Sequence, residues 1–261
     1  MRQVFEGRVA LVSGVGPGLG IEVVRGLARA GARLVLGDLD AAHLEAAARE
    51  AGRLGAVYVE DEVDVRDAAR CEALVARGLD AFGRVDVLVN DAFLAEQPMT
   101  FEAARLEDWQ AVADVNLWGT LRMIRAALPA LKRAGDACIV NVNTHGVERL
   151  DREFGGYTAS KAALAHLTRH LAREFGPYGI RVNGVHPGPM DGEPRRRHLE
   201  AMAAERGTSF DALHAEACGR TALGFLATPA DVAAAVLFLA SPAARAITGQ
   251  ALYVDGGEWF H

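Results

Sequence analysis

Short apolar runs alternate along the chain with longer stretches in which apolar residues recur every three or four positions. The short runs are rich in Val, Leu and Ile without polar alternation, which is typical of parallel strands covered on both faces. The longer stretches have the i, i+3, i+4 spacing of amphipathic helices. This pattern predicts strands at 9–12, 33–36, 56–59, 85–89, 137–142, 180–185 and 251–254, and helices at 18–30, 40–53, 66–82, 107–133, 155–176 and 229–240.

Such an alternation predicts an α/β fold, with a doubly wound parallel sheet of about seven strands and helices on both faces. In a Rossmann-type sheet of this kind, ligands bind at the carboxyl ends of the strands. No repeat, low-complexity tract or linker divides the sequence, so we expect residues 1–261 to form one domain. The polar segment 189–226 interrupts the rhythm as an insertion, either a surface helical pair or a lid over the crevice.

Composition narrows the class of protein. The net charge of −6 argues against a nucleic-acid partner or an anionic membrane surface. The three cysteines lie far apart and form no C-x-x-C pair, which indicates a reducing compartment and no metal site. No signal core and no run of about 18 apolar residues is evident, so we expect a cytoplasmic protein that acts on a small molecule.

A glycine-rich stretch, SGVGPGLG at 13–20, follows the first strand. Gly14, Gly18 and Gly20 have the spacing G-x-x-x-G-x-G, which departs from the common dinucleotide motif G-x-G-x-x-G. At a strand-to-helix turn, backbone N–H groups and the helix dipole attract a pyrophosphate. The stretch therefore indicates either a cofactor loop with altered spacing or a flexible turn.

Asp38 favours the first alternative. It ends the second strand, 18 residues after Gly20, where a carboxylate can accept hydrogen bonds from an adenosine ribose. A carboxylate there also repels a 2′-phosphate, so NAD is expected over NADP. Asp38 could instead cap the next helix, although Asp40 is better placed to do so.

Tyr157 and Lys161 form a second pattern, Y-x-x-x-K. On a helix these side chains share one face, and a neighbouring ammonium lowers the pKa of a phenol. A shift from about 10 to near 7 would make Tyr157 a base at neutral pH. Alone, this pattern is common by chance.

Taken together, these motifs resemble the classical short-chain dehydrogenase/reductase family over essentially the whole chain. The residues that carry the resemblance are Gly14, Gly18, Gly20, Asp64-Val65, Asn90-Asp91-Ala92-Phe93, Asn116, Thr144, Tyr157, Lys161, Pro187-Gly188 and the ending ITGQALYVDGG. The resemblance implies a cofactor site at Gly14, Gly18, Leu19, Gly20, Asp38, Asp64, Val65, Asn90, Ala92, Tyr157, Lys161, Pro187 and Gly188.

The resemblance also implies catalytic roles. Tyr157 would exchange a proton with the substrate oxygen, and Lys161 would lower the pKa of Tyr157 and hold the nicotinamide ribose. Thr144 would orient the carbonyl, and Asn116 would hold a water in a proton relay. A homo-oligomer, either a tetramer or a dimer, is implied with contacts through the helices at 107–133 and 155–176.

Three positions depart from the family pattern. Thr144 stands where the family has Ser, so the hydroxyl is kept on a stiffer side chain. Asp91 and Phe93 replace the second Asn and the Gly of N-N-A-G, and Phe93 brings a ring near the nicotinamide. These departures leave open a second interpretation, a protein that binds NAD(H) but has lost its chemistry.

Other features suggest the substrate without fixing it. Apolar residues of 189–226, such as Met190, Leu199, Phe210 and Phe225, hint at a bulky apolar alcohol. The run 195–197 of three arginines either meets an anionic substrate or solvates a helix. His145 and His186 either line a substrate pocket or have a packing role, and His166 and His170 are expected on a helix face. Trp118 and Met123 are expected in the core or at a subunit contact.

Overall fold

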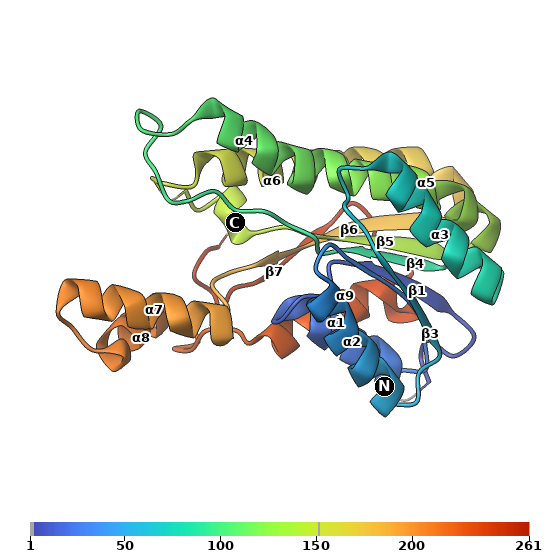
Figure 1. Cartoon of the computed structure of the whole chain (residues 1–261), viewed down its shortest axis with the longest axis horizontal. Helices are drawn as coiled ribbons and strands as arrows, with labels where there is room; N and C mark the ends of the chain where they lie inside the picture. Colours follow the sequence, from blue (N-terminus) through green and yellow to red (C-terminus); the bar gives the residue numbers. More distant parts are fainter. Residues whose placement is uncertain (1–2, 151, 261) are drawn as a thin grey trace.

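Seven parallel strands form one sheet, in the order β3-β2-β1-β4-β5-β6-β7, in the computed structural model, which describes residues 3–150 and 152–260 (Figure 1). Figure 1 shows helices on both faces of this sheet, so the expected α/β fold with a doubly wound sheet is confirmed. The strands are β1 (Val9–Ser13), β2 (Arg33–Asp38), β3 (Tyr58–Glu62), β4 (Val87–Asn90), β5 (Ala137–Val142), β6 (Ile180–Pro187) and β7 (Ala251–Val254).

The two faces are covered by separate groups of helices. One face packs against α1 (Leu19–Arg29), α2 (Ala41–Arg53) and α9 (Pro229–Ala240). The other face packs against α3 (Ala68–Phe82), α5 (Thr120–Ala134) and α6 (Gly155–Phe175).

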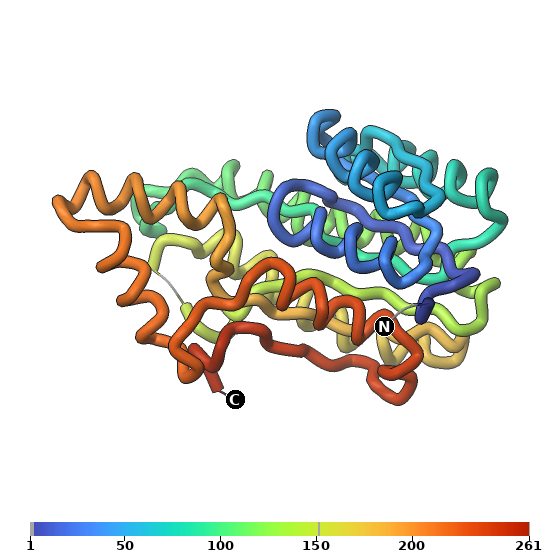
Figure 2. Tube along the Cα trace, turned by 90° about the horizontal axis from the view of Figure 1, so that it is seen from below, coloured from blue at the N-terminus to red at the C-terminus, as the bar shows by residue number. Residues whose placement is uncertain are grey.

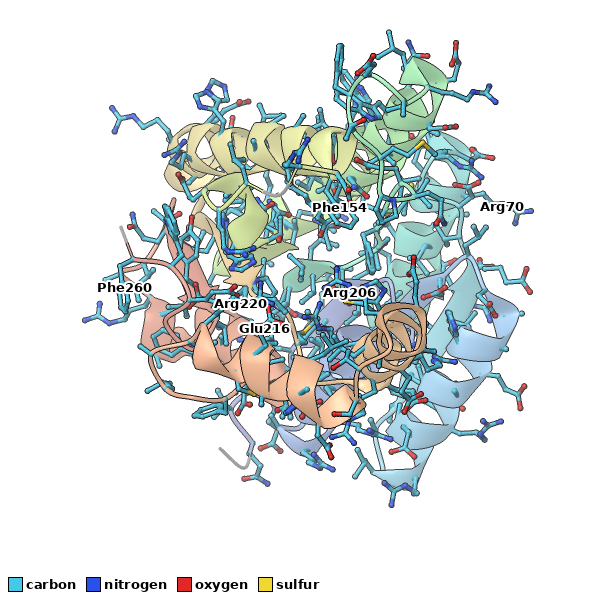
Figure 3. All side chains as sticks on the ribbon, turned by 90° about the vertical axis from the view of Figure 1, so that its left-hand side faces the viewer. Arg70, Phe154, Arg206, Glu216, Arg220 and Phe260 are labelled. Carbon is cyan, nitrogen blue, oxygen red and sulfur yellow. The ribbon has the colours of Figure 1, made fainter. Side chains whose placement is uncertain are left out.

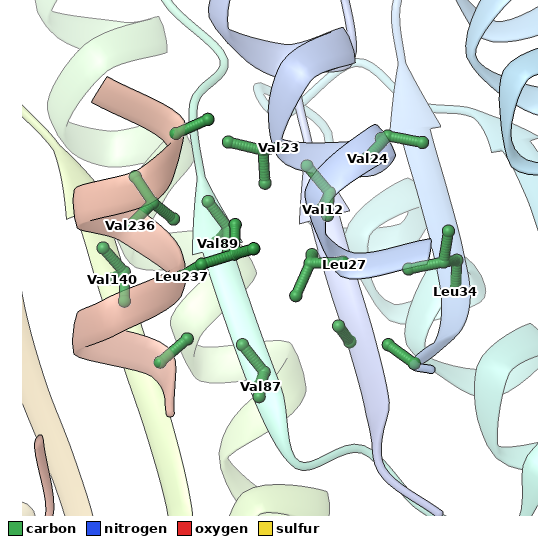
Figure 4. Close-up of a cluster of buried hydrophobic side chains, with 14 of the residues drawn as sticks. Val12, Val23, Val24, Leu27, Leu34, Val87, Val89, Val140, Val236 and Leu237 are labelled. Atoms are coloured by element: carbon green, nitrogen blue, oxygen red, sulfur yellow. The ribbon is translucent and has the colours of Figure 1, made fainter. Parts of the chain in front are cut away.

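Side-chain alternation along each strand divides the core in two. In β1, Ala10 and Val12 belong to the first cluster, whereas Val9 and Leu11 belong to the second. Figure 4 shows Val12 beside Val23 and Leu27 of α1 in the first cluster. Because successive strand residues point to opposite faces, a fully apolar strand such as β1 serves both cores.

Two predicted elements differ most from their expected bounds. The third strand is Tyr58–Glu62 rather than 56–59, and Glu60 and Asp61 stand in it because this strand lies at the edge of the sheet. The helix expected at 107–133 consists of α4 (Leu106–Ala113), a π-helical segment η1 (Asp114–Gly119) and α5.

The polar insertion forms two helices, α7 (Glu193–Arg206) and α8 (Phe210–Gly219). Figure 2 shows them as an arm that extends from the body of the molecule. Apolar side chains of this insertion form a small cluster between the two helices. Leu199 and Leu213 are buried in it with Ala203, and Met202 and Phe210 pack against them.

Candidate active site

The sheet reverses its winding direction between β1 and β4. The chain continues from β1 to β2 on one side and from β4 to β5 on the other, so the loops at the two carboxyl ends diverge. A crevice of about 1040 Å³ opens there. Most of the predicted site residues line it, namely Gly14, Gly18, Leu19, Gly20, Asp38, Asp64, Val65, Ala92, Thr144, Tyr157, Lys161, Pro187 and Gly188.

The glycine loop is shaped by close backbone approaches. Gly14 has a φ of 89°, and a Cβ there would lie 2.3 Å from the backbone N of Ala92, just after β4. A Cβ on Gly20 would lie 2.5 Å from the carbonyl oxygen of Gly14, so α1 can begin against the strand end only with a glycine at this position. Gly18 has a φ of 105° and no atom within 4 Å of a Cβ position, which leaves the start of α1 open to a ligand.

Asp38 lies in the crevice and also fixes the loop. One carboxylate oxygen accepts a hydrogen bond of 2.7 Å from the backbone N–H of Val15, and the other accepts one of 3.0 Å from Asp40. Asp40, rather than Asp38, caps α2 through the backbone N–H of Ala42. Asp38 is thus available for a role other than helix capping.

An ion pair with Arg66 holds the carboxylate of Asp64. Arg66 donates through Nε to both carboxylate oxygens and through Nη2 to one of them, the shortest contact being 2.6 Å. This ion pair holds the pKa of the Asp64 carboxyl below its usual range. Val65, beside it, is buried at the wall of the crevice, where the resemblance places an adenine contact.

Asn90 and Asn116 lie outside the crevice lining. Asn90 donates from its amide to the side-chain oxygen of Asn141, which ties β4 to β5. The amide of Asn116 both accepts from the backbone N–H of Leu94 and donates to its carbonyl, each at 2.8 Å. It also donates to the hydroxyl of Ser160 on α6. Asn116 therefore anchors the segment after β4. It lies on a π-helical turn, a geometry often found near functional sites. Its role in holding a water stays a prediction.

Thr144, Tyr157 and Lys161 meet at the inner end of the crevice. The ammonium of Lys161 donates to the carbonyl oxygen of Val142, at 2.8 Å, and lies 5.9 Å from the centre of the Tyr157 ring. Burial lowers the pKa of Lys161 to about 8. Burial raises the pKa of Tyr157 to about 12, although a hydrogen bond with Thr144 works in the opposite direction.

The expected lowering of the tyrosine pKa to near 7 was therefore wrong for these protein groups alone. Desolvation penalises the phenolate more than the hydrogen bond with Thr144 favours it. With this pKa, Tyr157 keeps its proton at neutral pH.

Asn143 was missed by the sequence patterns. It precedes Thr144, is buried at the wall of the crevice, and both polar atoms of its amide lack a hydrogen-bond partner among the described residues. A buried amide without partners is costly. Together with the open space at Gly18, this amide fits a polar ligand such as a dinucleotide. A lone Asn carries no motif, so only the structure could reveal it.

Asp91, one of the departures from the family pattern, also lines the crevice. Burial raises the pKa of its carboxyl to about 8, the positive charge of Lys161 acts to lower it, and Asp38 adds a further increase. In return, Asp91 acts to raise the pKa of Lys161. The two groups thus influence each other's charge beside the site.

Replacement of Asp91 by Asn should change how stability depends on pH. Because the carboxyl pKa is higher in the folded chain, the folded protein holds a proton that the unfolded chain releases, and stability falls as pH rises from about 4 to about 8. Asn cannot titrate, so the stability of the variant relative to wild type should increase by about 4 kcal/mol between pH 5 and pH 8. Urea unfolding at both pH values measures this gain.

Asp80→Asn is the matched control, because Asp80 is an exposed carboxyl on α3. It should show no such pH-dependent gain. A benefit of Asp91→Asn that is equal at both pH values would contradict the assignment.

The structure also places the histidines and the two core candidates that the sequence singled out. His186 is buried and its ring lies 4.7 Å from that of Tyr253. His170 lies 3.6 Å from Glu174 on the exposed face of α6. Met123 is fully buried, whereas Trp118 is 55% exposed and does not lie in the core of this chain.

No group of metal-binding side chains occurs among the described residues. Nor is any described helix long and apolar enough to cross a membrane.

The chain is similar over most of its length to known proteins. A family model described as enoyl-(acyl carrier protein) reductase matches residues 14–258. The chain is 38% identical to galactitol 2-dehydrogenase (L-tagatose-forming) of Cereibacter sphaeroides, over 98% of this chain and 97% of the relative. It is 37% identical to the 3-alpha-(or 20-beta)-hydroxysteroid dehydrogenase of Mycobacterium tuberculosis (strain ATCC 25618 / H37Rv), over 96% and 89%.

A solved structure of L-sorbose reductase from Gluconobacter frateurii, complexed with NADPH and L-sorbose, superposes with a TM-score of 0.93 at 26% identity, covering 99% of this chain and 98% of that one. The chain belongs to the short-chain dehydrogenase/reductase family. It is an oxidoreductase of the alcohol/ketone type within a family that binds a nicotinamide cofactor.

Proposed function

We propose that this protein is an NAD(H)-dependent oxidoreductase that interconverts a secondary alcohol and the corresponding ketone. The observation that carries the proposal is that Thr144, Tyr157 and Lys161 line the same crevice that the glycine loop opens. The crevice thus combines an anion-binding helix start with a proton donor and a buried ammonium.

Each group has a definite task in this proposal. The hydroxyl of Thr144 donates to the substrate oxygen, and the phenol of Tyr157 gives that oxygen its proton when a ketone is reduced. Lys161, held by the carbonyl of Val142, places a positive charge near the phenol and favours its ionised form when an alcohol is oxidised. The nicotinamide, when bound, supplies or accepts the hydride.

The charges around Asp38 support NAD over NADP. The carboxylate faces the crevice where the resemblance places the adenosine ribose, and a 2′-phosphate there would meet like charge. Arg66 is the guanidinium on this part of the wall, and it is already engaged by both oxygens of Asp64. His43 lies 3.6 Å from Asp38, so it also faces a carboxylate.

Asp38→Ala tests this cofactor assignment. Loss of the carboxylate should weaken NAD binding by about tenfold, since hydrogen bonds to a charged group are removed, and should relax the rejection of NADP. Fluorescence titrations with NADH and NADPH measure both effects. Asp67→Ala, which removes the capping carboxylate of α3, is the control and should alter neither affinity. Equal affinities of wild type for NADH and NADPH would defeat the assignment.

The substrate is proposed to be fairly bulky and apolar. Phe93, Leu94 and Met190 line the crevice, and Phe93 is 61% exposed at its edge. We further propose that α7 and α8 act as a lid, that the protein is cytoplasmic, and that it forms a dimer or tetramer. Exposed Leu106 and Trp118, on α4 and η1, support an oligomer contact there.

The proposed function is tested by following absorbance of NADH at 340 nm with a panel of secondary alcohols and ketones. Turnover of at least one class by wild type supports the enzyme. Tight NADH binding without turnover above that of a Tyr157→Phe variant would instead support a binding protein whose chemistry has lapsed.

A further inference from the structure

A second cavity lies under the α7–α8 arm. Its volume is about 240 Å³. The residues that line it come from the loop after β5, the two arm helices, the segments on either side of these helices, and the C-terminal segment. They are Arg149, Pro189, Arg195, Leu199, Met202, Arg206, Leu213, Glu216, Ala217, Arg220, Leu226 and Glu258.

This lining reverses the charge of the molecule. The chain as a whole has a net charge of −6, but the described lining contains four arginines and two glutamates. Figure 3 shows Arg206, Glu216 and Arg220 together on the side of the arm that faces the rest of the molecule.

Two of the four arginines have glutamate partners in the cavity wall. Glu258 is nearly buried and lies 3.2 Å from Arg149. Glu216 lies 3.9 Å from Arg220. Arg206 has no carboxylate within ion-pair distance among the described residues, so its guanidinium is free to bind an anion.

Of the three arginines at 195–197, only Arg195 lines this cavity. Arg196 donates to Asp191, and Arg197 lies 3.7 Å from Glu193 on the exposed side of α7. Arg195 lines the second cavity and also the large crevice. It therefore marks the place where the two spaces adjoin.

The position of the cavity relative to the chemistry follows from the chain. Arg149 lies on the loop that begins at Thr144, and Pro189 directly follows Gly188 of the crevice wall. A substrate whose reacting carbon lies beside Thr144 can extend past Arg195 toward the arm. Leu199, Met202 and Leu213 give this path an apolar wall.

We propose that the arginine-lined cavity binds a carboxylate at the far end of the substrate, which makes the substrate a hydroxy acid with an apolar stem. A carboxylate matches the planar fork of a guanidinium, and the apolar wall suits a hydrocarbon stem. This inference rests on the proposed alcohol oxidation, since it names the substrate of that same crevice.

The test is a ladder of (ω−1)-hydroxycarboxylic acids of increasing length, each compared with its primary amide. The amide keeps the shape and removes the charge. With wild type and NAD, kcat/KM should favour the acid over the amide by about tenfold at one optimal length, as expected for a hydrogen bond to a charged group. Acetate has the carboxylate but no alcohol, so it should not be oxidised.

Arg206→Met should abolish the preference for the acid over the amide of the same length. Arg197→Met removes an exposed arginine from the same helix and should retain the preference. Calorimetric binding of the acids and amides to the protein with NAD repeats the comparison without turnover.

The outcomes separate the two proposals. If amides and acids are oxidised equally well at every length, or if Arg206→Met and Arg197→Met behave alike, the carboxylate site is overturned and the alcohol oxidation stands. If no member of the ladder is oxidised yet the acids bind through Arg206, the oxidation of hydroxy acids is overturned and the anion site stands. Binding of neither acids nor amides overturns the carboxylate site.

Discussion

Tyr157→Phe is expected to lower kcat by about a thousandfold, with little change in the affinity for NADH. The phenol is the group placed to give a proton to the substrate oxygen, and general acid–base catalysis contributes about 10²- to 10⁴-fold. Burial holds the phenol protonated, with a pKa of about 12, so ketone reduction depends on this donor. Phe keeps the ring that packs beside Lys161 and removes only the hydroxyl.

Stopped-flow reduction of a ketone substrate, followed at 340 nm, measures the loss. Tyr178→Phe is the matched control, because Tyr178 is a half-exposed tyrosine beneath Lys132 and far from the crevice lining. It should retain wild-type rates. A Tyr157→Phe variant with more than a tenth of wild-type kcat would show that another group supplies the proton.

Gly14→Ala is expected to cause the largest loss of stability, about 3 kcal/mol or more. The new methyl would lie 2.3 Å from the backbone N of Ala92 and 2.7 Å from its Cα, so the ends of β1 and β4 would have to separate. Ala92 and Asp91 both donate to the carbonyl of Ser13, and these hydrogen bonds would be strained as well.

Gly83→Ala distinguishes the cost of the steric clash at Gly14 from the cost of placing a side chain at a positive φ. Gly83 ends α3 with a φ of 74° and has nothing within 4 Å of a Cβ position, so its replacement should cost only about 1 kcal/mol. Urea unfolding of both variants gives the difference. Equal losses would mean that the contact between the two strand ends does not constrain Gly14.

Strand and helix positions were largely predictable, because the buried strands are mainly apolar and the helices that cover the sheet bury an apolar face. Elements with weaker patterns were placed less well. The third strand contains Glu60 and Asp61 and lies at the edge, so its sequence does not resemble the buried strands. The π-helical segment at Asn116 depends on hydrogen bonds to Leu94, which no local pattern encodes.

Within the candidate site, spacing was informative where several residues act as one motif. Gly14, Tyr157 and Lys161 were found in this way and line one crevice. The tyrosine pKa was not predictable, because it depends on burial rather than on the four-residue spacing to Lys161. Asn143 escaped notice for the same reason, since its partnerless amide is a property of the folded chain.

The two hydrogen bonds that Asp38 accepts have a consequence for any attempt to redesign cofactor choice. The carboxylate that would discriminate against NADP also holds Val15 in the glycine loop and the backbone before α2. Removing it would therefore relax the discrimination between cofactors and also loosen the glycine loop. A successful redesign must keep an acceptor for the Val15 N–H, as Asn or Ser can, and supply a cation elsewhere on the wall.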